Sequence, residues 1–218
     1  MGIAGIILAA GESTRMGRDK ALLAWPPPRS VPTIPTVLDA TPRVQTGTLL
    51  SAAIQALARW SELVIVVGGR NEAALRPVVY SRAAFLVLNP TPELGQFSSL
   101  QTGLNEVLNR GRDAAMITLV DRPPAQRPTH KTLVNAFEGR DRETWSVVPE
   151  FQGKHGHPIL AAREMIEAFL RAPATSTARE VEHANKQHIA YISVNDPRVT
   201  MNLNTPEDYA ALRPRSRL

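Results

Sequence analysis

Ile3-Ala4-Gly5-Ile6-Ile7-Leu8 is an uninterrupted apolar run near the N-terminus, and Ala9-Ala10-Gly11-Glu12-Ser13-Thr14-Arg15-Met16-Gly17-Arg18-Asp19-Lys20 follows it directly. An apolar run of this length with several β-branched residues is typical of a buried strand in a parallel sheet. The residues after it are small or polar, and the glycines among them let the backbone come close to a ligand. Successive N–H groups in such a turn form a concave anion site, and Arg15 and Lys20 add positive charge. The stretch therefore predicts a phosphate-binding loop after a buried strand.

The spacing of this loop differs from that of the common phosphate-binding motifs. A Walker loop requires G-x-x-x-x-G-K-[ST], whereas Gly11 and Gly17 are six positions apart and Lys20 stands three residues beyond the second glycine. The dinucleotide fingerprint G-x-G-x-x-G does not follow the strand either. The loop therefore belongs to another class of phosphate site.

The overall composition suits a single α/β domain. The chain has 218 residues with 43% hydrophobic content, which is enough for one full-sized core. It has no cysteine, which excludes disulfides, thiolate zinc sites and cysteine nucleophiles. No apolar run reaches the length of about 18 residues that a membrane-spanning helix needs, and the N-terminus has no signal-peptide pattern. We expect a cytoplasmic protein with no membrane partner.

The net charge of +5, from 25 Lys and Arg against 20 Asp and Glu, raises the question of a nucleic-acid partner. The cations are scattered along the chain, and aromatic residues make up only 5%, too few for a platform on which bases stack. We therefore expect no nucleic-acid partner. An excess of positive charge also suits an enzyme that acts on polyphosphates.

Two segments interrupt or extend the predicted domain of residues 1–218. Five prolines fall within positions 26–35, which excludes a regular helix and predicts an extended surface insertion at 25–46. Docking of a partner is the alternative role for this insertion. Residues 210–218 contain three arginines and are expected to form a basic, solvated tail.

Apolar strands alternate with amphipathic helices along the rest of the chain. Strands are expected at 3–8, 63–67, 84–88, 114–120, 145–148, 158–160 and 189–192, and helices at 48–57, 72–79, 98–108, 163–170 and from 206 onward. This alternation predicts an α/β protein with a mostly parallel sheet covered by helices on both faces.

Asp121 follows the strand expected at 114–120. In an open parallel sheet, ligands bind beyond the carboxyl ends of the strands, so this acid is placed to face the phosphate loop. Mg²⁺ is a hard ion that binds one or two protein oxygens together with phosphates and waters. Asp121 is therefore our candidate metal ligand, with a turn or capping aspartate before Pro123 as the alternative.

The stretch Leu8-Ala9-Ala10-Gly11-x-Ser13-x-Arg15-Met16-Gly17-x-Asp19-Lys20 resembles the signature of nucleotidyltransferases that activate sugar phosphates, methylerythritol phosphate and molybdopterin, in particular the molybdenum cofactor cytidylyltransferase-like group. The resemblance implies a Rossmann-like three-layer α/β/α fold of the nucleotide-diphospho-sugar transferase type. Asp121-Arg122-Pro123 matches the D-x-P metal ligand that this family has at the end of the same strand. The residues that the resemblance assigns to the nucleotide in this loop are Leu8, Ala9, Ala10, Gly11, Ser13, Arg15, Met16, Gly17 and Lys20.

A second oxygen ligand for the metal is implied by Asn202-Leu203-Asn204-Thr205-Pro206-Glu207-Asp208, which resembles the D-I-D-T-P-E-D or N-I-N-T-P-E segment of the related enzymes. An asparagine offers a neutral carbonyl oxygen to a hard cation, so less negative charge surrounds the metal. Asn204 and Asn202 are both candidates. Capping of the helix that begins at Pro206 is the alternative for either.

Two further segments resemble the molybdopterin branch of the family. The first, Asn89-Pro90 with Gly95-Gln96-Phe97-Ser98-Ser99-Leu100, resembles its N-P…G-x-x-x-S-L helix start, where free N–H groups and hydroxyls suit a base edge or an anion. The second, Gly156-His157-Pro158, resembles its G-x-x-G-H-P loop, which lies where the pterin phosphate partner should bind. Ser98 is also compatible with a plain N-cap. The resemblance assigns the nucleotide to Asn89, Ser98 and Ser99, and the second substrate to Gly95, Gln96, Gly156, His157 and Pro158.

Two other kinds of site are weaker interpretations of the same residues. His155 and His157 suggest a zinc pair, but no third nitrogen or carboxylate stands at ligand spacing. Ser13 as a hydrolase nucleophile lacks both the G-x-S-x-G pattern and a supporting His or Asp. A polar loop that contacts substrate therefore explains the two histidines better than a metal pair does.

The resemblance implies a reaction without a covalent enzyme intermediate, in which the phosphate of molybdopterin attacks the α-phosphorus of CTP in line and expels pyrophosphate. Catalysis would then consist of positioning and charge stabilisation, with Mg²⁺ on Asp121 and with Arg15 and Lys20 offsetting negative charge. Cytidylyl-transferring relatives have L-A-A-G where guanylyl-transferring ones have L-A-G-G. Ala10 therefore favours CTP over GTP, although one methyl group discriminates weakly.

Three alternatives stay open at this point. The nucleotide could be GTP, or the acceptor could be another phosphate ester such as a sugar phosphate, methylerythritol phosphate or phospholactate. The chain could instead be a nucleotide-binding accessory protein without turnover, which helps to mature a molybdenum hydroxylase as its partner. Asparagine in place of an acid at position 204 fits the weakened metal site of such a protein.

Overall fold

The computed structural model describes residues 2–11, 13, 16–27 and 47–212. Arg15, most of the insertion predicted at 25–46 and the three arginines of the predicted tail lie outside these residues. The strands are β1 (Ile3–Leu8), β2 (Leu63–Gly68), β3 (Phe85–Leu88), β4 (Ala114–Leu119), β5 (Ser146–Phe151), β6 (Lys154–His155), β7 (Ile159–Ala162) and β8 (Ile189–Ser193). The α-helices are α1 (Leu49–Leu57), α2 (Glu72–Ser81), α3 (Gln96–Asn109), α4 (Arg127–Glu138), α5 (Arg163–Arg171), α6 (Ala178–Ala184) and α7 (Pro206–Ala211). Short 3₁₀ helices are η2 (Lys20–Leu22), η3 (Pro92–Leu94), η4 (Lys186–His188) and η5 (Pro197–Thr200).

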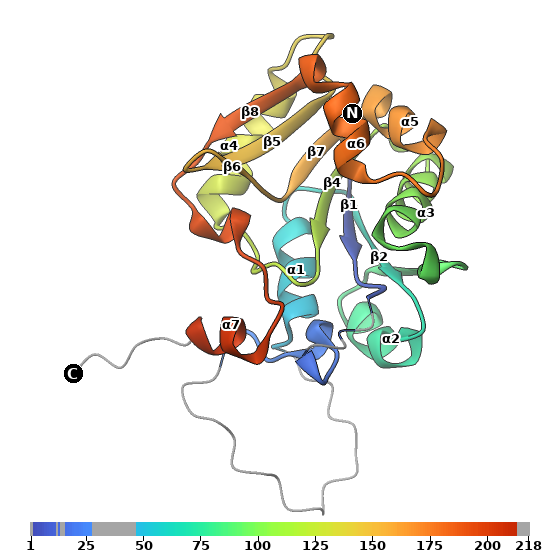
Figure 1. Cartoon of the computed structure of the whole chain (residues 1–218), viewed down its shortest axis with the longest axis vertical. Helices are drawn as coiled ribbons and strands as arrows, with labels where there is room; N and C mark the ends of the chain where they lie inside the picture. Colours follow the sequence, from blue (N-terminus) through green and yellow to red (C-terminus); the bar gives the residue numbers. More distant parts are fainter. Residues whose placement is uncertain (1, 12, 14–15, 28–46, 213–218) are drawn as a thin grey trace, which may run out of the picture.

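All the strands of the described residues belong to one sheet, in the order β3-β2-β1-β4-β7-β5-β6, with β8 paired to β5 (Figure 1). β1 is parallel to both β2 and β4, β2 is parallel to β3, and β5 is parallel to β8. β7 is antiparallel to its neighbours β4 and β5, and β6 forms an antiparallel hairpin with β5. The expected mostly parallel sheet is therefore confirmed, with its antiparallel strands in the second half of the chain.

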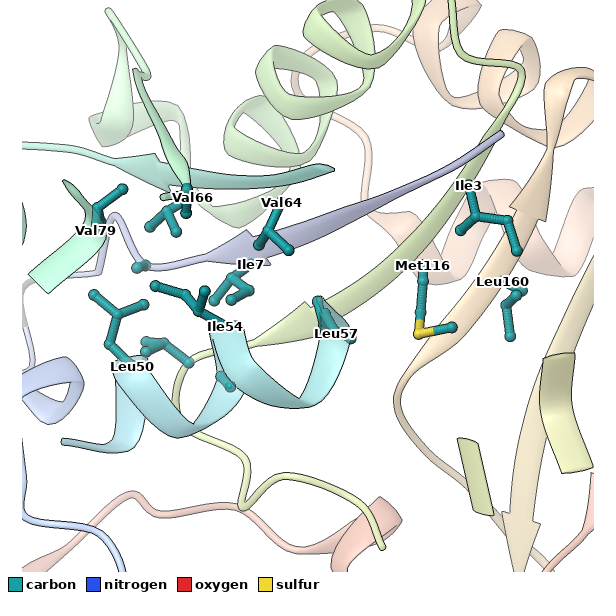
Figure 2. Close-up of a cluster of buried hydrophobic side chains, with 14 of the residues drawn as sticks. Ile3, Ile7, Leu50, Ile54, Leu57, Val64, Val66, Val79, Met116 and Leu160 are labelled. Carbon is teal, nitrogen blue, oxygen red and sulfur yellow. The ribbon is translucent and has the colours of Figure 1, made fainter. Parts of the chain in front are cut away.

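Alternate residues of β1 point into two separate hydrophobic layers. Ile7 belongs to the layer under α1, α2 and α4, together with residues such as Leu50 and Phe137. Ile6 belongs to the opposite layer under α3, α5 and α6, which includes Leu104. Figure 2 shows the first layer, where Ile7 of β1 lies against Leu50 and Ile54 of α1. Because both faces of the strand are buried, the sequence of β1 is apolar throughout.

Two helices, α4 and α6, are missing from the sequence-based expectation. The first turns of α4 contain Pro128 and mostly polar residues, and its larger buried apolar side chains, Leu133, Val134 and Phe137, lie in its second half. In α6 only Val181 is buried. Neither helix therefore carries enough of the 3.6-residue apolar period to be recognised from the sequence. At the other end of the chain α7 includes residues 210 and 211, so the predicted tail begins inside a helix.

The strand order reverses next to β1, and this places the site. β2 and β3 lie on one side of β1, whereas β4 lies on the other side, so the connections diverge at the carboxyl ends of β1 and β4. Leu8 pairs with Leu119 in register, and the N–H of Val120 donates to the carbonyl of Leu8 at 3.0 Å. The loop after β1 and the residues after β4 therefore start side by side. Among the described residues, no helix has the length and apolar character to cross a membrane.

Candidate active site

The loop after β1 contains a tight turn that the Ser13 hydroxyl stabilises. Ser13 and Gly17 both have positive φ, +52° and +69°, and the carbonyl of Ser13 accepts from the N–H of Met16 at 3.0 Å. The Ser13 hydroxyl accepts a hydrogen bond from the backbone N–H of Lys20 at 3.1 Å. The hydroxyl of Ser13, a residue that the resemblance assigns to the nucleotide, therefore helps to fix the position of Lys20.

Lys20 lies between the two predicted oxygen ligands of the metal. Its Nζ is 3.3 Å from Oδ2 of Asp121 and donates to Oδ1 of Asn204 at 3.1 Å. Only 12% of the Lys20 side chain and 27% of the Asp121 side chain are exposed, so solvent screens this pair less than it would a surface ion pair. Three segments far apart in the sequence thus meet at one point. The position of Asp121 beside the loop was predicted from the carboxyl ends of the strands, and that of the Asn204 segment from the family resemblance.

The segment before α7 is held against Asp121 by its own backbone. The N–H of Leu203 donates to the carbonyl of Asp121 at 2.8 Å. Oδ2 of Asp208 accepts from the N–H groups of Asn204 and Thr205, each at 2.9 Å, and these hydrogen bonds lower the pKa of the Asp208 carboxyl. Thr205 is the N-cap of α7, as predicted. The capping box therefore orients Asn204 toward Lys20.

Asn202, the other candidate ligand, is exposed on the surface of this segment. Among the described residues it has no hydrogen bond to Lys20 or Asp121, whereas Asn204 bonds directly to Lys20. The structure therefore brings Asn204 and not Asn202 to the meeting point.

The chemistry of this meeting point fits a hard divalent cation. Oδ1 of Asp121 is buried and has no hydrogen-bond partner among the described residues, which is a costly arrangement unless a cation or water satisfies it. Carboxylate and amide oxygens are the ligands that Mg²⁺ takes in proteins. In this structure the ammonium of Lys20 contacts the carboxylate of Asp121 and the amide oxygen of Asn204. No group of three or more His, Cys, Asp or Glu in the described part of the chain is arranged to hold a metal. Because Asp121 and Asn204 offer few oxygens, an ion bound here would complete its shell with phosphates and water.

Asp19 and Asn71 tie the loop to the connection after β2. Oδ1 of Asp19 accepts from the N–H of Ala21 as the N-cap of η2, and its Oδ2 accepts from Nδ2 of Asn71 at 2.7 Å. The same amide donates to the carbonyl of Ala9 at 3.0 Å. Asn71 was not predicted, because a single polar residue after Gly68-Gly69 has no distinctive signal in the sequence.

Ala10 lies against Gly69 in the connection after β2. A Cβ at position 69 would stand 3.0 Å from the carbonyl oxygen of Ala10 and 3.2 Å from its Cβ, so a larger residue there would push the loop outward. Gly69 thus allows the chain to approach the loop closely. The methyl group of Ala10 occupies the space that a glycine at that position would leave open.

Three residues of the predicted nucleotide set have side chains in the core: Leu8, Ala9 and Met16. Met16 is buried in a small cluster with Leu23, Leu49, Leu203 and Tyr209, which packs the loop against α7; Figure 1 shows α7 beside this first part of the chain. Leu8 is 7% exposed and belongs to the layer under α3. Met16 and Leu8 therefore position the backbone of the loop, and any contact they make with a nucleotide is limited to main-chain atoms or an edge of Leu8. Gly11 is exposed, with open space where a Cβ would lie.

Asn89, Ser98 and Ser99 are brought together at the start of α3. Nδ2 of Asn89 donates to the hydroxyls of Ser98 and Ser99 at 2.8 and 2.9 Å, and all three residues are buried. The Ser98 hydroxyl donates in turn to the carbonyl of Gly95 at 2.8 Å. The helix begins two residues earlier than predicted, at Gln96, with Gly95 as its N-cap, so Ser98 is not the cap. These side chains brace the turn before α3.

A cavity of about 490 Å³ lies beside the ends of β1 and β4. Its lining includes four of the residues predicted to bind the second substrate, and Pro158, the fifth, is buried next to them. None of the residues described between 9 and 20 lines it, so the described part of the loop after β1 lies outside this cavity. Gly95, Gln96, Gly156 and His157 are the four, and Arg122, Arg179, Glu182 and Tyr191 also line the cavity.

His157 is a neutral side chain in the wall of this cavity. Burial and the nearby charge of Arg122 lower the pKa of His157 to about 3. Its Nδ1 lies 3.3 Å from the carbonyl of Ile117, which accepts its proton and leaves Nε2 as an acceptor. His155 lines the same cavity, and its ring stacks on Tyr191 at a centroid distance of 3.9 Å. The described residues include no group of three or more His, Cys, Asp or Glu that could hold a metal around the two histidines.

Sequence reasoning gave no role to Arg122, Glu182 or Tyr191, which also line the cavity. Burial raises the pKa of Glu182 to about 7, and burial together with Glu182 and Glu150 raises the pKa of Tyr191. Arg122 directly follows Asp121, and that adjacency was the signal available in the sequence. The other two residues lie on α6 and β8, whose place beside the cavity depends on long-range packing.

Comparison with known proteins agrees with this geometry. The family model described as the MobA-like NTP transferase domain matches residues 5–189. The chain is 32% identical over 232 residues to the molybdenum cofactor guanylyltransferase of Rhodobacter capsulatus, covering 100% of the chain and 98% of that protein. It is 21% identical over 211 residues to the molybdenum cofactor cytidylyltransferase of Escherichia coli strain K12, covering 96% and 95%.

Solved structures show the same fold at lower identity. The manganese complex of Rv0371c from Mycobacterium tuberculosis H37Rv is 20% identical, with a TM-score of 0.71 over 98% of each chain. The CMP:2-keto-3-deoxy-manno-octonic acid synthetase complexed with CTP is 11% identical, with a TM-score of 0.71 over 98% of this chain and 97% of that one. The predicted fold of the nucleotide-diphospho-sugar transferase type is therefore confirmed.

Proposed function

The chain belongs to the MobA-like NTP transferase family, and from this we propose that it transfers CMP from CTP to the phosphate of a molybdopterin-type acceptor and releases pyrophosphate. It is a nucleotidyltransferase by family membership. The observation that carries the proposal is the meeting of Lys20, Asp121 and Asn204 at the carboxyl ends of β1 and β4. This point lies between the loop after β1 and the cavity whose wall includes Arg122, the residue next to Asp121.

The roles of the residues follow from this arrangement. The backbone of the loop from Ala9 to Gly17 would bind the phosphates of the nucleotide, with Arg15 as a further cation in the proposal. Lys20 would contact the α-phosphoryl or the leaving pyrophosphate, where negative charge develops in the transition state. The attack needs no nucleophile from the protein, because an oxygen of the acceptor phosphate is itself the nucleophile.

Asp121 and Asn204 would hold a Mg²⁺ ion, which supplies Lewis-acid stabilisation of the phosphates. The fit rests on the unsatisfied, buried Oδ1 of Asp121 and on the oxygen character of both ligands. The manganese complex of the Mycobacterium tuberculosis relative supports a divalent metal at this fold. Asn204 contributes no charge, so the metal site is one unit less negative than a site with two carboxylates.

The acceptor would bind in the cavity next to Asp121. The N-terminus of α3 opens on this cavity through Gly95 and Gln96, and His157 offers a neutral acceptor there. A cavity of about 490 Å³ is large enough for a fused heterocycle with a phosphate arm. A molybdenum hydroxylase that receives the finished cofactor would be the onward partner.

GTP is the second candidate for the nucleotide. It is favoured by the guanylyltransferase of Rhodobacter capsulatus, which at 32% has a higher identity to this chain than the cytidylyltransferase at 21%. CTP is favoured by Ala10, which narrows the space beside Gly69. We choose CTP because the loop residue lies at the site, whereas overall identity reflects the whole chain.

A panel assay tests the proposal. The protein is incubated with molybdopterin, Mg²⁺ and each of the four nucleoside triphosphates, and pyrophosphate is measured with and without acceptor. We expect acceptor-dependent release with CTP. Release with GTP alone would contradict the base assignment, and absence of release with every nucleotide and acceptor would contradict the enzymatic function and support an accessory role.

A further inference from the structure

Arg122 lies where the metal site and the cavity meet. It follows Asp121 directly in the sequence, and its side chain lines the cavity together with His157 and Gln96. None of the described residues from 9 to 20 lines this cavity. Arg122 therefore faces the side on which the acceptor would bind rather than the loop for the nucleotide.

One edge of the Arg122 guanidinium is left without a partner. Its Nη1 donates to the carbonyl of Val199 at 3.1 Å. Its Nε is buried and has no hydrogen-bond partner among the described residues, and no ion pair with Arg122 occurs among them. An arginine binds carboxylate or phosphate bidentately through two parallel N–H groups. The Nε–Nη2 edge of Arg122 is such a pair, and neither nitrogen has a hydrogen bond to any residue that the structure describes.

The loop at Gly156 keeps this edge in place. The carbonyl of Val199, which holds Nη1 of Arg122, also accepts from the N–H of His157 at 2.9 Å. A Cβ at Gly156 would overlap that carbonyl, so only glycine lets the two segments approach this closely. The Gly156-His157-Pro158 loop thus positions Arg122 through Val199.

The charges around Arg122 favour an anionic ligand. His157 is uncharged at neutral pH. The positive charge on this wall of the cavity therefore comes from the guanidinium of Arg122. Asp121 is the nearby carboxylate, but it points its Oδ2 at Lys20 and forms no ion pair with Arg122 in the described part of the chain. A partly buried cation with an unused hydrogen-bonding edge is unfavourable until an anion pairs with it.

We propose that Arg122 binds the phosphate monoester of the acceptor through its Nε–Nη2 edge and so brings a phosphate oxygen beside Asp121. This inference rests on the proposed function, because it concerns the acceptor of the same reaction. It assigns a residue that selects acceptors ending in a phosphate monoester, whatever group carries that phosphate.

The test compares one heterocycle with and without its phosphate. Binding of hydroxymethylpterin and of hydroxymethylpterin monophosphate is measured by pterin fluorescence in the presence of Mg²⁺, with no nucleotide and hence no turnover. We expect the wild-type protein to prefer the phosphate ester by about 10- to 100-fold, as a charge-assisted bidentate contact allows. In Arg122→Gln this preference should disappear, whereas the affinity for unphosphorylated hydroxymethylpterin should stay the same. Arg122→Lys, which keeps the charge but not the fork, should retain only part of the preference.

Arg179 provides the matched control, because it is the other arginine in the cavity lining. Arg179→Gln removes the same charge and should leave the preference within about twofold, since Arg179 is exposed and is not adjacent to Asp121. CTP affinity and the melting temperature report whether each variant is folded, and Arg122→Lys carries the test if Arg122→Gln does not fold. Preference retained in both Arg122 variants or lost in Arg179→Gln would overturn the inference, as would equal affinities of the wild-type protein for hydroxymethylpterin and its monophosphate where both bind.

A second arm separates this inference from the proposed function. Glucose 1-phosphate and methylerythritol phosphate are titrated directly into the wild-type protein and into Arg122→Gln, and their binding is measured by calorimetry. If one of these esters binds in an Arg122-dependent manner and no pterin does, the role of Arg122 stands and the pterin acceptor is wrong. If the affinity for every phosphate ester is the same with and without Arg122, the proposed role of Arg122 is wrong, even where pyrophosphate release supports nucleotidyl transfer.

Discussion

Nζ of Lys20 lies 3.3 Å from Oδ2 of Asp121, although the two residues are 101 positions apart in the sequence. The contact joins the loop after β1 to the residue that follows β4, and it exists because these two strands are parallel neighbours. The same ammonium bonds to Asn204, so it lies against the oxygens that would bind a metal. In the proposed site, Lys20 and a metal would therefore compete for Asp121 until a triphosphate gave Lys20 another partner.

Replacing Lys20 should separate metal affinity from nucleotide affinity. In Lys20→Met, Mn²⁺ should bind at least about threefold more tightly without nucleotide, because a competing cation has been removed from Asp121. CTP should bind about tenfold more weakly, because a charged contact to its phosphates is lost. Paramagnetic resonance of free Mn²⁺ and calorimetry measure the two affinities. Lys131→Met, an exposed lysine on α4, is the control and should change neither; weaker Mn²⁺ binding in Lys20→Met would contradict the competition.

A pair of substitutions distinguishes the two candidate asparagine ligands. Asn204→Asp adds a carboxylate beside Lys20 and Asp121 and should tighten Mn²⁺ binding about tenfold, because it adds a negative charge within the site. Asn202→Asp adds the same charge at an exposed position and should change the affinity by less than about twofold. Titration of Mn²⁺ into each variant measures the difference. A larger effect at position 202 would show that the segment before α7 binds the metal through the other residue.

The lowered pKa of His157 should make the free energy of unfolding fall in acid. Its pKa is about 3 in the folded protein, against an ordinary value of 6.5 in the unfolded chain. The unfolded state therefore binds more protons between these values, so the contribution of neutral His157 is fully present above pH 6.5 and falls as the pH drops toward 3. Urea unfolding between pH 4 and 7 measures the slope, and His157→Gln should flatten it. An unchanged slope would mean that His157 is not held neutral.

The raised pKa of Glu182 should make the free energy of unfolding change with pH in the opposite direction. Burial raises its pKa to about 7, compared with an ordinary value of 4.5. Here the folded state binds more protons between the two values, so the free energy of unfolding falls as the pH rises from 4.5 to 7 and is constant above that range. Glu182→Gln should remove this fall and make the protein more stable at pH 8. Glu180→Gln, an exposed neighbour on α6, is the control, and an equal gain there would refute the assignment to Glu182.

The parts of the fold that depend on short segments could be predicted from the sequence. The apolar run of β1 predicted a strand buried on both faces, and Thr205 as N-cap followed by Pro206 predicted α7. The antiparallel position of β7 between β4 and β5 could not be predicted, because strand direction depends on how distant segments pair rather than on local pattern. For the same reason α6 and β8, which line the cavity, had no predicted role.

The site shows the same division. The proximity of Asp121 to Lys20 followed from the rule that ligands collect at the carboxyl ends of parallel strands. The choice between Asn204 and Asn202 did not follow, because it depends on the capping box that turns one side chain inward and leaves the other exposed. Met16 was expected at the nucleotide and is buried with Tyr209, since a motif shows spacing but not which side chains pack beneath it.

Product analysis with matched aspartate variants tests the central claim most directly. The protein is incubated with molybdopterin, Mg²⁺ and CTP labelled at the α-phosphate, and the product is identified by mass spectrometry. We expect CMP joined to the pterin phosphate, with turnover reduced at least about 100-fold in Asp121→Ala. Asp113→Ala, at the amino end of the same strand, should retain wild-type turnover. Label found only in free CMP, or equal turnover in the two variants, would contradict nucleotidyl transfer at Asp121.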